Sequence, residues 1–263
     1  MKRLIGCLRM DMRRAYLCPP FWISAVGVCL ILFISIIQEL QLPGDRDVLY
    51  YSWVTEQYDF SMLFPLFAAV PFSISFCTDW NNQFIRPSCI RSNVKIYGLS
   101  KALTAGIAGG SAVVLGNILL IIGLCFRFPL MDKSLPTYQN FGDVPPFGAL
   151  LNGNHIILYF LFKLLVQFFA CAFYAMLAFF ISTYIINPFV TLAVPILFYY
   201  LLLNVQYIIH MPTIVDPFVV FSGRIDMKSP TLSLLYMILY LGIFCMAICF
   251  LSVKRIQKRL GNG

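Results

Sequence analysis

The sequence carries little charge and few of the motifs with which enzymes do chemistry. Only 11% of its 263 residues are charged and 60% are hydrophobic, with a mean hydropathy of +0.83. Soluble domains carry roughly 25% charged residues, so a water-soluble enzyme is excluded. The sequence has no G-x-x-x-x-G-K-[ST] phosphate loop, no H-E-x-x-H pair and no G-x-S-x-G motif. We therefore expect neither catalysis nor bound ATP in this chain.

Metal-binding and disulfide patterns are missing as well. The only two histidines, His155 and His210, lie far apart in the sequence, and we expect no metal site. The nine cysteines lack metal-type spacing, and the closest pair, Cys245 and Cys249, lies inside an apolar run. A disulfide-built secreted protein is shorter and far more polar. We therefore expect free thiols.

Long apolar runs dominate what is present. About 20 apolar residues suffice to cross a bilayer, and six such runs cover residues 21–38, 60–77, 102–126, 156–182, 189–205 and 232–253. The second contains Pro65 and Pro71, which predict a kink whose freed carbonyls neighbouring helices must satisfy. Asn187-Pro188 predicts a tight turn between the fourth and fifth runs. The predicted fold class is all-α: one polytopic membrane domain, residues 1–263, with six transmembrane helices.

The basic residues indicate the orientation in the membrane. Thirteen of the 19 lie in the N-terminal tail, in the loop after the second run and at the C-terminus. The only acids in these segments are Asp11 and Asp79, and the other nine acids lie elsewhere. The positive-inside rule then places both termini of this multi-pass protein in the cytoplasm. Anionic lipid, rather than nucleic acid, accounts for the net charge of +8.

The N-terminal segment, residues 1–20, is expected to be an amphipathic helix in the inner membrane interface. One face of such a helix is apolar and another is basic. The apolar face carries Leu4, Ile5, Leu8 and Met12, and the basic face carries Arg9 and Arg13. A plain positively charged anchor is the alternative.

The cytoplasmic loop, residues 79–101, mixes bases with apolar residues. Its bases include Arg86, Arg91 and Lys95, and its apolar residues include Ile85 and Tyr97. A loop needed only for orientation could be short and purely polar. The mixture favours a short helix that docks onto a cytoplasmic partner, and a helix lying on the membrane surface is the alternative.

Two features inside the predicted spans also call for an explanation. Lys163 is the one charge within a span. Its ammonium either snorkels to the outer headgroups or faces a cavity on a substrate path, where it contacts an anionic substrate or pairs with an outer-loop acid. Gly106 and Gly110, followed by Gly116, predict close packing of the third span against another helix.

Taken together, these features resemble the membrane subunit of an ATP-binding-cassette exporter of the ABC type-2 class, over essentially the whole chain. Members of that family have an acid just past span two, then Arg-rich sequence, then a lysine opening span three. Asp79, Arg86, Arg91 and Lys101 stand at those places, although the family's frequent Glu-Arg pair is Asp79-Trp80 here. The resemblance implies that residues 85–97 are a coupling helix resting on an ATPase subunit. It also implies that residues 206–231 form a re-entrant outer element.

The resemblance implies a permease in the plasma membrane of a bacterium, without cofactors of its own. ATP and Mg²⁺ are expected on separate ATPase subunits, and a second permease subunit, identical or homologous, is expected beside this one. Spans rich in Phe and Tyr favour an amphipathic or hydrophobic cargo, such as an antimicrobial peptide, a drug or lipid-like material. The alternative is a non-transporting assembly or sensor protein whose loop recruits a cytoplasmic partner.

Overall fold

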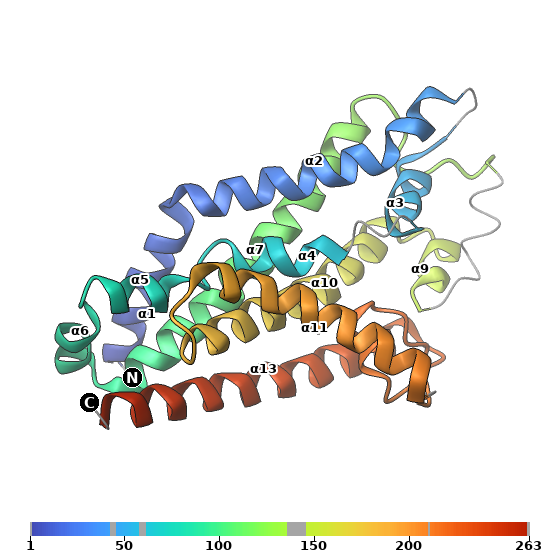
Figure 1. Ribbon diagram of the computed structural model, residues 1–263. Helices are drawn as coiled ribbons and strands as arrows, with labels where there is room; N and C mark the ends of the chain where they lie inside the picture. Colours follow the sequence, from blue (N-terminus) through green and yellow to red (C-terminus); the bar gives the residue numbers. More distant parts are fainter. Residues whose placement is uncertain (1, 43–45, 58–61, 136–145, 210, 262–263) are drawn as a thin grey trace.

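The computed structural model describes residues 2–42, 46–57, 62–135, 146–209 and 211–261. All regular structure in these ranges is helical (Figure 1). The shorter helices are α1 (Lys2–Leu17), α3 (Val48–Gln57), α4 (Phe64–Ala69), α5 (Ser75–Asn81), α6 (Ile85–Ser92), α9 (Gly148–Asn152) and α12 (Pro217–Phe221). The longer ones are α2 (Pro19–Gln41), α7 (Val94–Cys125), α10 (Ile156–Ser182), α11 (Pro188–Ile209) and α13 (Pro230–Gly261).

The five longer helices are each long and apolar enough to cross a membrane. Their outer faces keep large apolar side chains exposed, including Ile23 and Leu30 on α2 and Leu235 and Phe250 on α13. Contiguous apolar surface of this extent is not a feature of soluble monomers. The prediction of an all-α membrane protein is therefore confirmed, and α10 has the bounds expected from the sequence.

The second predicted span, residues 60–77, is not one continuous helix. Its first two residues lie outside the described part of the chain, and the rest is divided into α4 and α5 by a turn over residues 70–74. Pro71 lacks the N–H that would bond to the carbonyl of Phe67. Ser24 of α2 donates its hydroxyl to that carbonyl at 2.6 Å. The predicted distortion at the prolines and its compensation by a neighbouring helix are confirmed. The helix is interrupted at this point, however, and not merely bent.

Helix α7 occupies the centre of the bundle and packs against α10, α2, α1 and α13. Small residues allow this close approach. A Cβ on Gly106 would lie 2.9 Å from Met176, and one on Gly116 would lie 2.6 Å from the carbonyl oxygen of Ala25. The predicted close packing of the third span is therefore confirmed.

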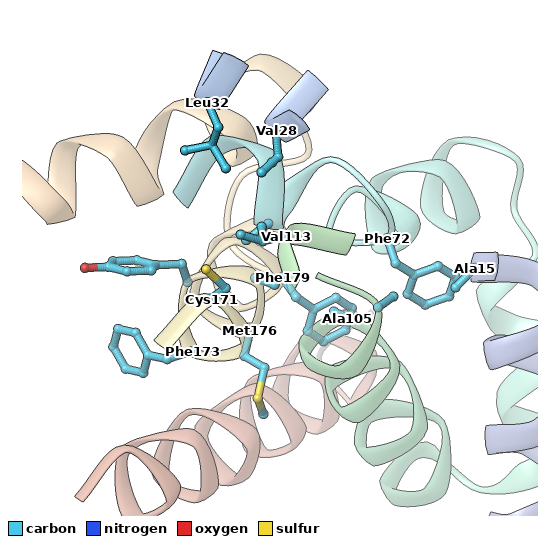
Figure 2. Packing of buried hydrophobic residues seen from close by; sticks show 14 of the residues in the cluster. Ala15, Val28, Leu32, Phe72, Ala105, Val113, Cys171, Phe173, Met176 and Phe179 are labelled. Atoms are coloured by element: carbon cyan, nitrogen blue, oxygen red, sulfur yellow. The ribbon is translucent and has the colours of Figure 1, made fainter. Parts of the chain in front are cut away.

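The buried core runs between these helices. Figure 2 shows Val28 and Leu32 of α2 beside Val113 of α7, and Met176 and Phe179 of α10 belong to the same cluster. All five side chains are almost completely buried. The core therefore follows α7 along the bundle.

The two ends of the bundle differ in charge. The described ends of the chain lie together at one end, beside α5 and α6 (Figure 1). The first turns of α7 lie at the same end. The turn between α10 and α11 also lies there, because Arg259 near the end of α13 donates to the carbonyl of Thr183 at 2.5 Å. We call this the basic end, since it gathers the three basic segments. Helices α3, α9 and α12 lie toward the opposite end.

Candidate functional site

A cluster of buried ion pairs joins three helices at the basic end. The Nζ atom of Lys101 on α7 lies 2.9 Å from Oδ2 of Asp79 on α5 and 3.1 Å from Oδ1 of Asp11 on α1. These three residues are each less than a tenth exposed. The cluster fastens α1 and α5 to the beginning of α7.

Further donors complete the cluster. Tyr97 donates its hydroxyl to Oδ2 of Asp79 at 2.9 Å, and Ser100 donates to Oδ2 of Asp11 at 2.6 Å. Arg14 donates to Oδ1 of Asp79 at 3.1 Å. All four oxygens of the two carboxylates therefore have a partner, as buried charges require.

The environment of Asp79 keeps this carboxyl ionised. Burial by itself raises the pKa of a carboxyl group. The Lys101 ammonium, the hydrogen bonds from Lys101 and Tyr97 and the Arg14 guanidinium outweigh that cost, and they hold the pKa of Asp79 below its usual value. Asp79 therefore carries its negative charge at neutral pH.

Three of the seven residues predicted to couple to an ATPase, namely Asp79, Tyr97 and Lys101, belong to this cluster. The buried ones among the seven are Asp79, Ile85, Tyr97 and Lys101. Lys95 is exposed, while the side chains of Arg86 and Arg91 on α6 lie outside the described part of the structure. The buried residues hold the loop in place, whereas Lys95 and Phe84 are exposed on its surface.

The loop itself is shorter than the sequence indicates. The predicted short helix is present as α6, but α7 begins at Val94 rather than at the predicted span boundary of 102. Lys95, Tyr97 and Lys101 therefore lie on the first turns of α7. Asn93 ends α6 with φ of 70° and accepts a hydrogen bond from the backbone N–H of Lys95, which starts the new helix.

The end of α13 forms a second attachment to the loop. The guanidinium of Arg259 lies 4.3 Å from the centre of the Trp80 ring, which directly follows Asp79. A Cβ on Gly98 would touch Ile256 and Val253 at 3.3 Å. The loop is thus fastened to both the first and the last helix of the chain.

A cavity of about 460 Å³ lies in the other half of the bundle. Helices α2, α3, α4, α7, α10, α11 and α12 all contribute to its lining. Aromatic rings form much of the wall, and α12 folds inward to supply two of them. The Phe221 ring of α12 lies 4.7 Å from Phe173 and 5.4 Å from Tyr174, both on α10. The re-entrant role of residues 206–231 stays a prediction, with residue 210 outside the described part.

Lys163 lines this cavity in an ion pair. Its Nζ lies 2.5 Å from Oε1 of Glu56 on α3 and donates to the hydroxyl of Ser52 at 2.9 Å. Of the two alternatives for Lys163, the structure shows the features of the second, since the side chain lines a cavity and pairs with an acid of the first predicted outer loop. Its role on a substrate path stays a prediction.

Several participants were missed from the sequence. Asp11, Arg14 and Ser100 were not assigned to any site, and neither were Glu56 and Arg224 at the cavity. A signal existed for Asp11, because it and Asp79 are the only acids within three otherwise basic segments. Two lone acids surrounded by bases at one end of a bundle are expected to share a basic partner.

No known relative adds to this picture. Comparison with known protein families, with curated proteins and with solved structures finds no match. Within the described ranges, no group of three or more metal-ligating side chains could hold a metal ion. The function must therefore be argued from the geometry of the loop, the buried cluster and the cavity.

Proposed function

We propose that this chain is the membrane-spanning permease subunit of a bacterial ABC transporter. Separate ATPase subunits would bind ATP and Mg²⁺, and the permease would export an amphipathic or hydrophobic cargo. The observation that carries the proposal is the position of α7. This helix begins at the loop and the buried cluster, and its Asn117 lines the cavity at the other end.

The buried cluster supports a mechanical link between loop and cavity. Breaking a buried ion pair by separating the partners leaves uncompensated charge and costs several kcal/mol. A displacement of α6 and α5 is therefore transmitted to Lys101 rather than absorbed at the contact. From Lys101 to Asn117, α7 rises about 24 Å at 1.5 Å per residue, which carries the motion toward the cavity.

The charge distribution supports the orientation. With the basic end in the cytoplasm, the broken segment α4–α5 completes six crossings and both termini face inward. Helix α1 then lies at the inner interface, held by Asp11 to α7. The α13 helix has 32 residues, about 48 Å at 1.5 Å per residue, so its basic end extends past a hydrocarbon core of about 30 Å.

A second permease subunit is part of the proposal. Helix α11 is the least buried of the five long helices, and large side chains such as Leu197 and Leu201 are exposed on it. Such faces meet either lipid or a second membrane subunit. A cargo path between two subunits would then border the cavity wall that α11 contributes through Tyr199.

The loop surface provides the test. The double variant Phe84→Asp/Lys95→Glu changes two exposed side chains of the loop without touching the buried cluster. We expect it to lower the amount of ATPase subunit that co-purifies with the C-terminally tagged chain by about tenfold or more, since losing an apolar anchor and reversing a charge exceeds about 1.4 kcal/mol. The measurement is the molar ratio of the two chains by quantitative mass spectrometry.

The matched control is Lys254→Glu, which reverses an exposed lysine at the same end of the bundle but on α13. It should leave the ratio unchanged. Equal loss in both variants would mean that the charge of the whole end matters, not the loop. A stoichiometric partner without any nucleotide site would replace the permease proposal with the assembly or sensor alternative.

A further inference from the structure

The described part of the cavity lining has more basic than acidic side chains. Its basic residues are Lys163 and Arg224, and its acidic residue is Glu56. Glu56 is engaged by Lys163, whereas Arg224 forms no ion pair with any residue in the described ranges. The Arg224 side chain is exposed and borders both this cavity and a smaller one beside it, formed with Gln206 and Tyr207. A guanidinium in this position is suited to bind a carboxylate or a phosphate.

The rest of the lining favours an apolar body. The rings of Tyr159 and Tyr174 on α10 and of Phe218 and Phe221 on α12 face the cavity. Asn117 on α7 adds a polar group. A volume of about 460 Å³ lies in the range of cavities that hold one drug-sized molecule, roughly 300–1,000 Å³. A folded peptide cargo does not fit inside it.

We propose that this cavity binds an amphipathic anion. Its apolar body would lie against the aromatic rings of α10 and α12, and its carboxylate or phosphate would bind Arg224, with Lys163 nearby. This inference deepens the proposed function, since it names the cargo class on which the permease would act. Binding itself needs no ATPase, so it can be tested on the chain alone.

An amphipathic cation is the less favourable occupant. Its only anionic partner among the described lining residues would be Glu56, whose Oε1 already lies 2.5 Å from Lys163. A cation would have to displace the ammonium of Lys163 and leave that charge inside a partly apolar cavity, which is costly. The charge already present therefore selects against cations.

Trp53 provides a reporter, because it lines the cavity and is one of only three tryptophans. Replacing Trp22 and Trp80 by Phe leaves Trp53 as the only emitter. In phosphatidylcholine nanodiscs, we expect 11-bromoundecanoate to quench Trp53 at a concentration at least tenfold lower than 11-bromoundecylamine. Arg224→Gln should remove this preference, since a charge-assisted pair is worth more than about 1.4 kcal/mol, or tenfold.

Arg127→Gln is the matched control, because Arg127 is an exposed arginine beyond the end of α7 that does not line the cavity. It should retain the preference. Equal quenching by the two probes, or a preference that survives Arg224→Gln, would overturn the proposal. If no ATPase subunit co-purifies with the wild-type chain while quenching is intact, only the transport function is overturned.

Two sources of the anion can be separated in the same assay. Nanodiscs that contain phosphatidylglycerol should abolish quenching by the bromocarboxylate if a membrane lipid is the natural occupant. Quenching that is unchanged in these discs identifies a free amphiphile instead. Both results support an anionic occupant, and dependence on Arg224 remains the criterion in each.

Discussion

Replacing Lys101 with methionine is expected to lower the free energy of unfolding by about 3–5 kcal/mol, the cost of removing one partner from a buried ion pair. Lys101 is almost completely buried and is the only residue that contacts both Asp11 and Asp79 in the described structure. Without it, the Ser100 hydroxyl is the one remaining partner of Asp11 among the described side chains. Two carboxylates then remain close together with too little positive charge to compensate them.

The measurement is unfolding by SDS titration in mixed micelles, followed by circular dichroism. Lys254→Met removes an exposed lysine from α13 and should change the free energy by less than about 0.5 kcal/mol, as most surface substitutions do. Asp11→Asn added to Lys101→Met should restore part of the loss, because one of the two uncompensated charges is removed. A Lys101→Met protein as stable as the wild type would show that the cluster does not fasten these helices.

Gly109→Ala is expected to destabilise the bundle by about 1–3 kcal/mol, the usual cost of overpacking. Gly109 lies where α7 crosses both α4 and α10. A Cβ there would lie 2.5 Å from the Cβ of Ala175 and would also collide with the backbone carbonyl of Ala68. Backbone atoms on α4 cannot move aside as a flexible side chain can, so α7 must shift away from its neighbours.

Gly123→Ala makes the same chemical change on the same helix. A Cβ at Gly123 meets nothing within 4 Å, so this variant should be as stable as the wild type or slightly more stable, since alanine favours the helix. The thermal inactivation temperature of the detergent-solubilised protein distinguishes the two variants. Equal temperatures for both would mean that α7 does not depend on this close contact.

The membrane-spanning helices were predictable because their signal is local. An apolar run of sufficient length identifies a span by itself, and α10 begins and ends where the sequence indicates. Pro71 marks the weak point of the second span for the same reason, since a missing N–H is a property of one residue. Whether the helix bends or breaks depends on the neighbour. Here Ser24 satisfies the freed carbonyl.

The site was only partly predictable because its contacts are not local. Lys101 and Asp79 were recognised as important, but the second partner of Lys101, Asp11, lies about 90 positions away along the chain. A pair with an outer-loop acid was one of the alternatives for Lys163, yet several acids occur there and composition does not select Glu56. Arg224 had no distinguishing pattern at all, since its position depends on how α12 folds into the bundle.

The central claim is that ATP hydrolysis on subunits bound to the loop moves the walls of the cavity. This claim is tested most directly at the cavity mouth. Ser222 is exposed and lines the cavity. A Ser222→Cys protein, with the exposed Cys125 replaced by Ser, is purified with the proposed ATPase subunit and placed in nanodiscs. The rate of labelling by a membrane-impermeant maleimide is then compared with ATP plus vanadate and with ADP, and the Cys125→Ser parent gives the background.

We expect ATP plus vanadate to raise the labelling rate of Ser222→Cys several-fold, because closure of the ATPase subunits tilts α7 and opens the outer half of the bundle. Phe84→Asp/Lys95→Glu should show no such change. Equal rates with ATP and with ADP, in a complex that hydrolyses ATP, would contradict coupling between the loop and the cavity.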